Sequence, residues 1–163
     1  MDKKMLFVSL VVIGAVFSQM AGDCFADAAS DIQTAEDYYN SGLYPQAESA
    51  YKSVVQSYPG TEYGFKAQKA LALLYISVDK DTHAQSAVDK LAADFSSNPN
   101  LPAALNEIGS TYRWTKKYQQ TKGVYQKIIQ SCAGTEAAGN APLELFKLDI
   151  LALIDAQADS PAQ

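Results

Sequence analysis

Few side chains in this sequence could carry out catalysis. The 163 residues include a single histidine, His83, and two cysteines, Cys24 and Cys132. A zinc site, a Ser–His–Asp triad or a Cys–His pair would therefore depend on His83 alone. Asp79 and Asp81 lie near it in the sequence, but a metal site needs more ligands than these, and nothing predicts a pocket around them. We expect a protein that is not an enzyme and that holds no metal ion and no cofactor.

The composition is that of a folded, acidic chain, long enough for one domain or one short repeat array. Hydrophobic residues make up 48% of the chain and charged residues 19%, and the formal net charge is −5. Proteins that bind nucleic acids or anionic membranes through general electrostatic attraction need a basic surface. We therefore expect neither of them to be a partner.

Residues 1–28 have the pattern of an export signal. Two lysines precede an uncharged, mostly apolar run at 5–17, and small residues follow near the expected cleavage site. The run is shorter than the ~20 residues of a membrane-spanning helix, which favours cleavage over a retained anchor. Cleavage after Ala26 or after Ala28 fits the pattern. We expect an exported protein, periplasmic or secreted, without an integral membrane span.

Cys24 raises the alternative of a lipid-modified N-terminus, which would tether the chain to a membrane. Bacterial lipoprotein signals place a small residue directly before the cysteine, whereas Asp23 stands here. Lipid anchoring is therefore the less favoured alternative. Cleavage after Ala26 would leave Cys132 as the single cysteine, so the fold would depend on its apolar core rather than on an internal disulfide.

Three copies of a 37-residue pattern run through the rest of the chain. The segment that begins at Tyr44 matches the segment that begins at Tyr118, which lies twice 37 positions later, and a third copy lies halfway between them. The apolar residues of each copy have the 3-4 spacing of two amphipathic helices, and one helix is expected over 62–77, its apolar face interrupted by Gln68. The repeats span about 28–64, 65–101 and 102–138. The positions expected in their core are Ala35, Tyr38, Ala47, Tyr51, Tyr75, Ala84, Gly109, Tyr112 and Tyr125.

This pattern resembles the tetratricopeptide repeat. The 34-residue consensus of that family has a small residue, a tyrosine, an alanine and a proline at set positions, and Ala35, Tyr38, Ala47 and Pro59 match them in the first copy. The third copy departs from the consensus in its second helix and its exit turn. The longer turns between the repeats are similar to those of bacterial periplasmic and outer-membrane members, of the Tol–Pal accessory and outer-membrane assembly lipoprotein types.

The resemblance implies an all-α fold, namely a right-handed α-α superhelix of three helix pairs with a C-terminal capping helix. It also implies the function of a non-catalytic scaffold of the bacterial cell envelope, which binds an extended segment of a protein or peptide partner. A self-associating structural subunit and a peptidoglycan-associated accessory protein remain alternatives.

The capping helix is expected at about 140–155, within a cap that spans 139–155, and the tail 156–163 is expected to be disordered. Pro142 fits the first turn of this helix. Its apolar residues surround most of the circumference, which leaves two interpretations open. They are buried against the last repeat, or they form a surface through which the chain forms a homo-oligomer.

The resemblance also implies a groove lined by the first helix of each repeat. Four of the expected groove residues are basic, and Glu36 is the one acid expected to face them. The groove is thus expected to be locally basic and to suit a peptide that carries a carboxylate or acidic side chains. Lysines that merely solvate this face are the alternative. The expected groove residues are Tyr39, Asn40, Lys66, Lys69, Asn106, Arg113, Trp114 and Lys147.

Overall fold

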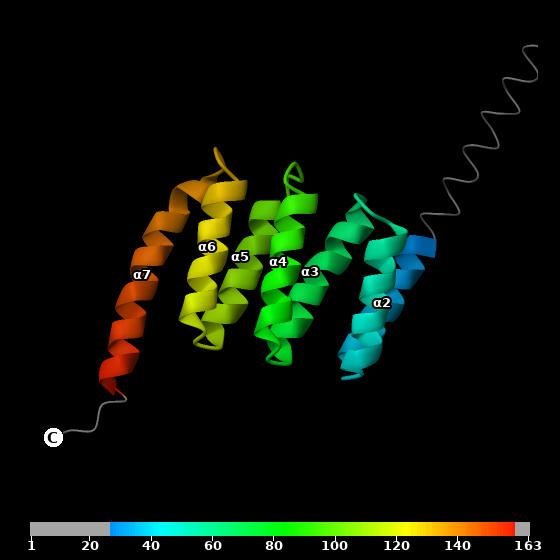
Figure 1. Cartoon of the computed structure of the whole chain (residues 1–163), viewed down its shortest axis with the longest axis horizontal. Coiled ribbons are helices and arrows are strands. Elements are labelled where there is room, and N and C mark those ends of the chain that lie inside the picture. Colours follow the sequence, from blue (N-terminus) through cyan, green and yellow to red (C-terminus); the bar gives the residue numbers. More distant parts are fainter. Residues whose placement is uncertain (1–26, 159–163) are drawn as a thin grey trace, which may run out of the picture.

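The computed structural model describes residues 27–158, in which all of the regular structure is helical (Figure 1). The expected all-α class is therefore confirmed for this part of the chain. Nearly all of the expected signal segment lies outside the described residues, as does the end of the expected tail. Residues 27–40 form the first described helix. The helices that follow it are α2 (Tyr44–Ser57), α3 (Glu62–Ser77), α4 (Asp81–Asp94), α5 (Leu101–Trp114), α6 (Tyr118–Ser131) and α7 (Glu136–Ala158).

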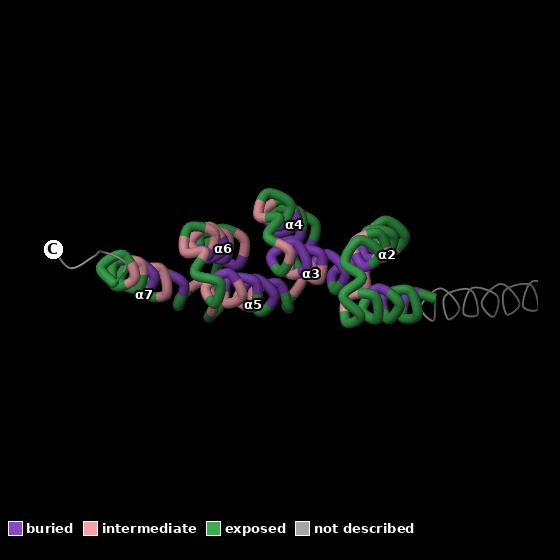
Figure 2. Tube along the Cα trace, turned by 90° about the horizontal axis from the view of Figure 1, so that it is seen from below, coloured by how far each residue is buried: buried purple, intermediate pink, exposed green. Residues whose placement is uncertain are grey.

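Short turns join consecutive helices into antiparallel pairs that stack in two layers (Figure 2). We call the layer of the 27–40 helix, α3, α5 and α7 the first layer, and the layer of α2, α4 and α6 the second layer. Within the first layer, α3 contacts α5 and α5 contacts α7; within the second layer, α4 contacts α6. Each repeat therefore contributes one helix to each layer, and the core lies between the layers.

The turn inside each repeat is closed by one residue in the left-handed region. Gly42, Asp79 and Lys116, each 37 positions after the last, have φ angles of 72°, 57° and 57°. The backbone N–H of the next residue then donates to the carbonyl of a tyrosine five positions before it, which ends the first helix and reverses the chain. The three donor–acceptor pairs are Leu43–Tyr38 at 2.9 Å, Lys80–Tyr75 at 2.8 Å and Lys117–Tyr112 at 3.0 Å.

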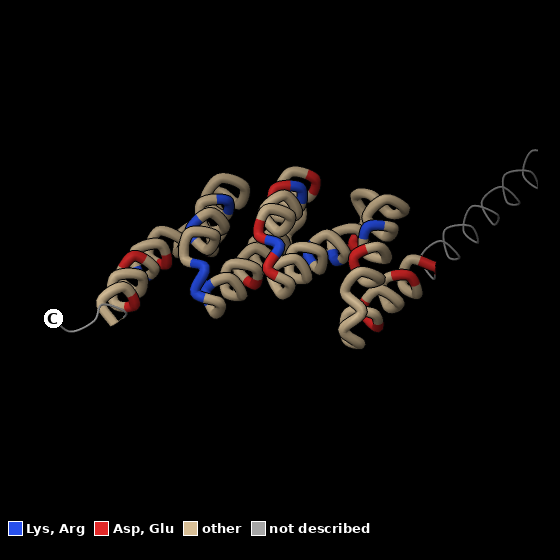
Figure 3. Tube along the Cα trace, turned by 60° about the horizontal axis from the view of Figure 1, so that its bottom comes forward, with Lys and Arg blue, Asp and Glu red and all other residues tan. Residues whose placement is uncertain are grey.

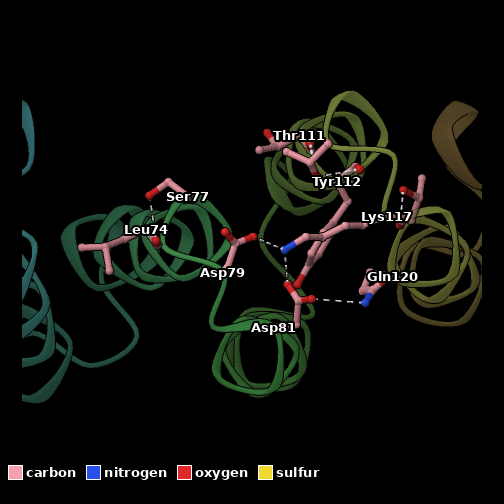
Figure 4. Close-up of polar contacts among 10 residues, drawn as sticks. Leu74, Ser77, Asp79, Asp81, Thr111, Tyr112, Lys117 and Gln120 are labelled. Atoms are coloured by element: carbon pink, nitrogen blue, oxygen red, sulfur yellow. Dashed lines mark hydrogen bonds and ion pairs between the residues drawn. The ribbon is translucent and has the colours of Figure 1, made fainter.

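Eight of the nine expected core positions are buried, and Tyr38 is the exception. Its side chain is 37% exposed, so the expectation that it belongs to the core is wrong. The equivalent Tyr75 donates its hydroxyl to Glu48 in α2, and the equivalent Tyr112 lies beside Asp81 in α4 (Figure 4). Both tyrosines thus pack beneath the second helix of the preceding repeat. No described helix precedes the 27–40 helix to cover Tyr38. The buried positions are Ala35, Ala47, Tyr51, Tyr75, Ala84, Gly109, Tyr112 and Tyr125.

The last helix begins earlier than expected. Its N-terminus is capped by Thr135, whose Oγ1 accepts a hydrogen bond from the Ala138 N–H at 3.3 Å, just as Thr61 caps α3. The boundary expected at 138/139 therefore falls inside α7, and Pro142 lies in the helix interior rather than in its first turn. A proline there removes a backbone hydrogen bond, and α7 bends near its start in Figure 1. Residues 156–158, expected to be disordered, are helical.

Polar contacts link the repeats at the ends of the helices. Between the second and third repeats, the Lys117 ammonium lies 2.7 Å from both Asp79 and Asp81 (Figure 4). Between the first and second repeats, Glu48 accepts hydrogen bonds from Tyr75 at 3.0 Å and from Lys80 at 3.1 Å. Each contact joins one repeat to the next, so these groups oppose separation of the stack.

Replacing Gly42 by alanine is expected to destabilise the fold, whereas the same change at Gly139 is expected to stabilise it. Gly42 needs a positive φ, which costs a residue with a Cβ about 1 kcal/mol, while Gly139 lies in helix α7. Alanine is preferred over glycine in a helix by about 1 kcal/mol. Neither site has a heavy atom within 4 Å of the added Cβ, so steric clashes do not enter. Urea unfolding measures the free energy of unfolding of both variants. If both changes shift this free energy in the same direction, the prediction is contradicted.

Two tyrosine hydroxyls should differ in their effect on stability. The Tyr75 hydroxyl donates to Glu48, whereas the buried Tyr112 hydroxyl has no hydrogen-bond partner among the described residues. Burial also raises the pKa of Tyr112 to about 12. Tyr75→Phe is expected to lower the free energy of unfolding by about 1 kcal/mol, and Tyr112→Phe to leave it unchanged or raise it. Thermal unfolding tests this pair, and a larger loss in Tyr112→Phe would refute it.

The Glu48 carboxylate predicts a specific loss of stability in acid. Hydrogen bonds from Lys52, together with those from Lys80 and Tyr75, lower the pKa of Glu48 from 4.5 to about 2. A carboxyl group whose pKa is lower in the folded state stabilises the fold fully above pH 4.5 and loses this effect as the pH falls toward 2. The free energy of unfolding of wild type should therefore fall more steeply over this window than that of Glu48→Gln. Denaturant titrations at several pH values measure the free energy of unfolding of both proteins. Equal slopes of this free energy against pH would contradict the assignment.

Candidate functional site

A cavity of about 370 Å³ lies in the first layer, between the 27–40 helix and α3. Tyr51 of α2 is 3% exposed and reaches the cavity from the second layer. Tyr39 stands at the opening, where its ring packs edge-on against Tyr44 with the centroids 5.7 Å apart. The cavity therefore has aromatic and aliphatic walls with charged groups at its edge. Its lining residues are Glu36, Tyr39, Tyr51, Lys66, Lys69, Ala70 and Leu73.

Three of the eight expected groove residues line this cavity, namely Tyr39, Lys66 and Lys69. Asn40 is exposed at the end of the 27–40 helix and does not line it. The other four lie farther along the same layer, on α5 and α7. Among them Trp114, at the end of α5, is 83% exposed. The structure thus brings part of the expected groove together and distributes the rest along the layer: Asn106, Arg113 and Trp114 on α5, and Lys147 on α7.

The expected positive charge of the groove is largely offset, because each of its four expected cations lies beside a carboxylate, although Arg113 and Lys147 share Glu144. Figure 3 shows acidic as well as basic positions along the helices of this layer. Two of the pairs join residues three or four positions apart on one helix, which the sequence could have revealed. The pair between α3 and α5 has no such local signal. The pairs are Lys66–Glu62 at 3.0 Å, Lys69–Glu107 at 2.8 Å, Arg113–Glu144 at 3.6 Å and Lys147–Glu144 at 2.7 Å.

A second cavity, of about 310 Å³, opens on the second layer between α2 and α4, with α3 beneath it. We call it the α2–α4 cleft. Gln68, the residue that interrupts the apolar face of α3, is 3% exposed there and donates from Nε2 to the Ala87 carbonyl at 3.0 Å. Sequence reasoning noted Gln68 but did not expect a cavity. The lining residues are Lys52, Val55, Gln56, Gln68, Leu71, Tyr75, His83, Ser86, Ala87 and Lys90.

His83 and Cys132 do not line the same cavity. His83 lines the α2–α4 cleft with its ring centroid 5.3 Å from that of Tyr75. Cys132 is buried in α6's C-terminal turn region, and burial raises the pKa of its thiol. In the part of the chain that the structure describes, no three His, Cys, Asp or Glu side chains are grouped so that they could hold a metal ion.

The apolar residues of α7 are largely exposed. Only Ala141 and Leu148 of this helix are buried. The interpretation that the whole apolar surface packs against the last repeat is therefore wrong, although one side of α7 does contact α5 and α6. The described residues leave the other side uncovered. The exposed side chains are Leu143, Phe146, Ile150, Leu151, Leu153 and Ile154, with exposed fractions between 38% and 65%.

Comparison with protein-family models and curated proteins adds no relative. No protein-family model matches the chain, and no curated protein matches it either. Between residues 27 and 158, no helix combines the length and the apolar character that a membrane span requires. The two cavities and the exposed side of α7 are therefore the features from which a function can be argued.

Proposed function

We propose that this chain is an exported, non-catalytic scaffold that binds an extended segment of a protein partner along its first layer. In this proposal the three helix pairs are tetratricopeptide-like repeats, wound as a right-handed superhelix with the first layer on its concave side, and α7 is the cap. The single observation that carries the proposal is the cavity between the 27–40 helix and α3. It is one of the places where a ligand would meet first helices of two consecutive repeats.

The chemistry of this cavity favours an apolar anchor side chain. Tyr51, Ala70 and Leu73 offer apolar surface, and its volume of about 370 Å³ falls in the range of ligand pockets. An aromatic or aliphatic side chain that enters such a pocket contributes much of the affinity of a peptide. The partner segment would therefore carry one large apolar residue, placed against Tyr39.

Charges at the edge of the cavity would set the register of the bound segment. Lys66 and Lys69 are paired with Glu62 and Glu107, and their side chains are 52% and 29% exposed. Exposed ion pairs contribute little stability, so exchanging one carboxylate partner for another costs little. Acidic groups that flank the apolar anchor would thus replace the internal carboxylates at little cost. A partner that bound through charge alone would gain little affinity, because it would only exchange one carboxylate for another.

The proposed compartment is argued from the first residues of the sequence. The signal-like pattern of 1–28 supports export, and the repeat resemblance supports a place in a bacterial envelope. Self-association is the second candidate function, supported by the exposed apolar side of α7. Light scattering over a range of concentrations separates the two, because a peptide-binding monomer keeps one molar mass.

Peptides selected from a random display library against the purified chain test the proposed function. The selected consensus should contain one large apolar residue, and Tyr39→Ala should raise its Kd at least about tenfold, equivalent to ~1.4 kcal/mol. The double variant Lys66→Glu, Lys69→Glu should weaken binding by a similar factor. Fluorescence anisotropy with a labelled consensus peptide measures both effects.

Ser53→Ala is the matched control, because Ser53 is exposed on α2 in the second layer. It should bind the peptide as wild type does. Circular dichroism establishes that each variant is folded. If folded Tyr39→Ala and the folded double lysine variant both bind the consensus peptide at full strength, the first-layer cavity is not the binding site.

A further inference from the structure

The α2–α4 cleft has a closed counterpart one repeat further along the chain. Helices α2, α4 and α6 begin 37 residues apart, so each residue of the α2–α4 interface has an equivalent between α4 and α6. Helices α4 and α6 contact each other directly, whereas no Cα atom of α2 lies within 8 Å of one in α4. The same arrangement of helices is thus closed at one interface and open at the other.

Charge distinguishes the two interfaces. Between α4 and α6, the Lys127 ammonium lies 3.0 Å from the Asp89 carboxylate. The equivalent residues between α2 and α4, 37 positions earlier, are Lys90 and Lys52. An attractive pair across the closed interface is therefore replaced by two ammonium groups across the cleft, and like charges repel at close range.

Two further differences of residue type accompany the charge. Leu105 is fully buried on α5 at the closed interface, and its equivalent on α3 is the polar Gln68, which lines the cleft. Gly123 on α6 faces α4, since a Cβ there would lie 3.8 Å from Gln85 Oε1, an ordinary contact distance. Its equivalent on α4 is Ser86, which also lines the cleft. The open interface therefore presents polar groups where the closed one is packed.

The carboxylates around the cleft do not neutralise its cations. Glu48 lies 2.6 Å from Lys52 and 3.1 Å from Lys80, and it also accepts the Tyr75 hydroxyl. Lys90 has no ion-pair partner among the described residues. Lys52 and Lys80 thus share one carboxylate, and that carboxylate lies on α2 rather than between α2 and α4. The cleft has an excess of positive charge in a chain that is acidic overall.

We propose that the α2–α4 cleft is a binding site for a carboxylate-bearing ligand. The carboxylate would lie between Lys52 and Lys90, in the role that Asp89 has beside Lys127 at the closed interface. Val55, Leu71 and the ring of Tyr75 would contact a short apolar portion of the ligand. A cleft of about 310 Å³ suits a small molecule or a single acidic side chain of a partner. This site is on the second layer and is independent of the proposed peptide site.

Titration of the ¹⁵N-labelled chain with matched ligand pairs tests this assignment. The probes are hexanoate with hexanamide, and a capped Ala-Glu-Ala peptide with capped Ala-Gln-Ala. The carboxylate members should shift amide signals of α2 and α4 saturably at concentrations up to about 50 mM, which detects a Kd in the millimolar range. If hexanoate saturates the shifts, the carboxylate that the cleft binds comes from a free small molecule. If only the Glu peptide saturates them, it comes from a side chain of a partner protein.

Three variants make the test specific. Lys90→Gln should raise the Kd by roughly fivefold or more, because it removes one charged hydrogen bond. Lys127→Gln, the equivalent change at the closed interface, should leave the Kd unchanged. Lys52→Asp recreates the Asp89–Lys127 arrangement, so it should abolish the shifts while circular dichroism shows the chain folded. Equal binding of acids and amides, no binding of any probe, or wild-type affinity in Lys90→Gln would overturn the proposal.

Discussion

The left-handed residue in the turn within each repeat sets the register on which the rest of the structure depends. Gly42, Asp79 and Lys116 end the first helices at the same point, so the second helix of every repeat starts at the same point too. Residues 37 positions apart therefore occupy equivalent places at successive interfaces. Because the register does not vary, a change of residue type at one repeat produces a local difference between interfaces rather than a new fold.

Local patterns predicted the helices well, since helix ends depend on residues nearby in the sequence. The helix expected over 62–77 matches α3 because Thr61 caps one end and the turn at Asp79 closes the other. Burial was harder to predict, because it depends on the neighbouring repeat. Tyr38 has the same local pattern as its buried equivalents and is exposed only because no described helix covers it.

The candidate site was also hard to predict where its properties depend on contacts between repeats. Tyr39, Lys66 and Lys69 were expected on one face, and they do line one cavity. Their net charge could not be predicted from helical spacing, because Lys69 pairs with Glu107 across two helices that are separate in sequence. The α2–α4 cleft was missed for a related reason. Lys52 and Lys90 occupy the positions that Asp89 and Lys127 occupy at the next interface. Their importance is therefore recognised only when the two interfaces are compared.

Together these features give the two layers different surfaces, with paired charges around an apolar cavity on one and, on the other, a cleft with more ammonium groups than carboxylates. The second layer thus opens between α2 and α4 and closes between α4 and α6. Spin labels on the equivalent C-terminal residues of these helices measure this directly, with one pair at Ser57 and Asp94 and the other at Asp94 and Ser131. We expect a longer distance for the first pair than for the second, and a shorter first distance once Lys52→Asp is introduced. Equal distances for the two pairs in the wild-type chain would contradict this difference between the two interfaces.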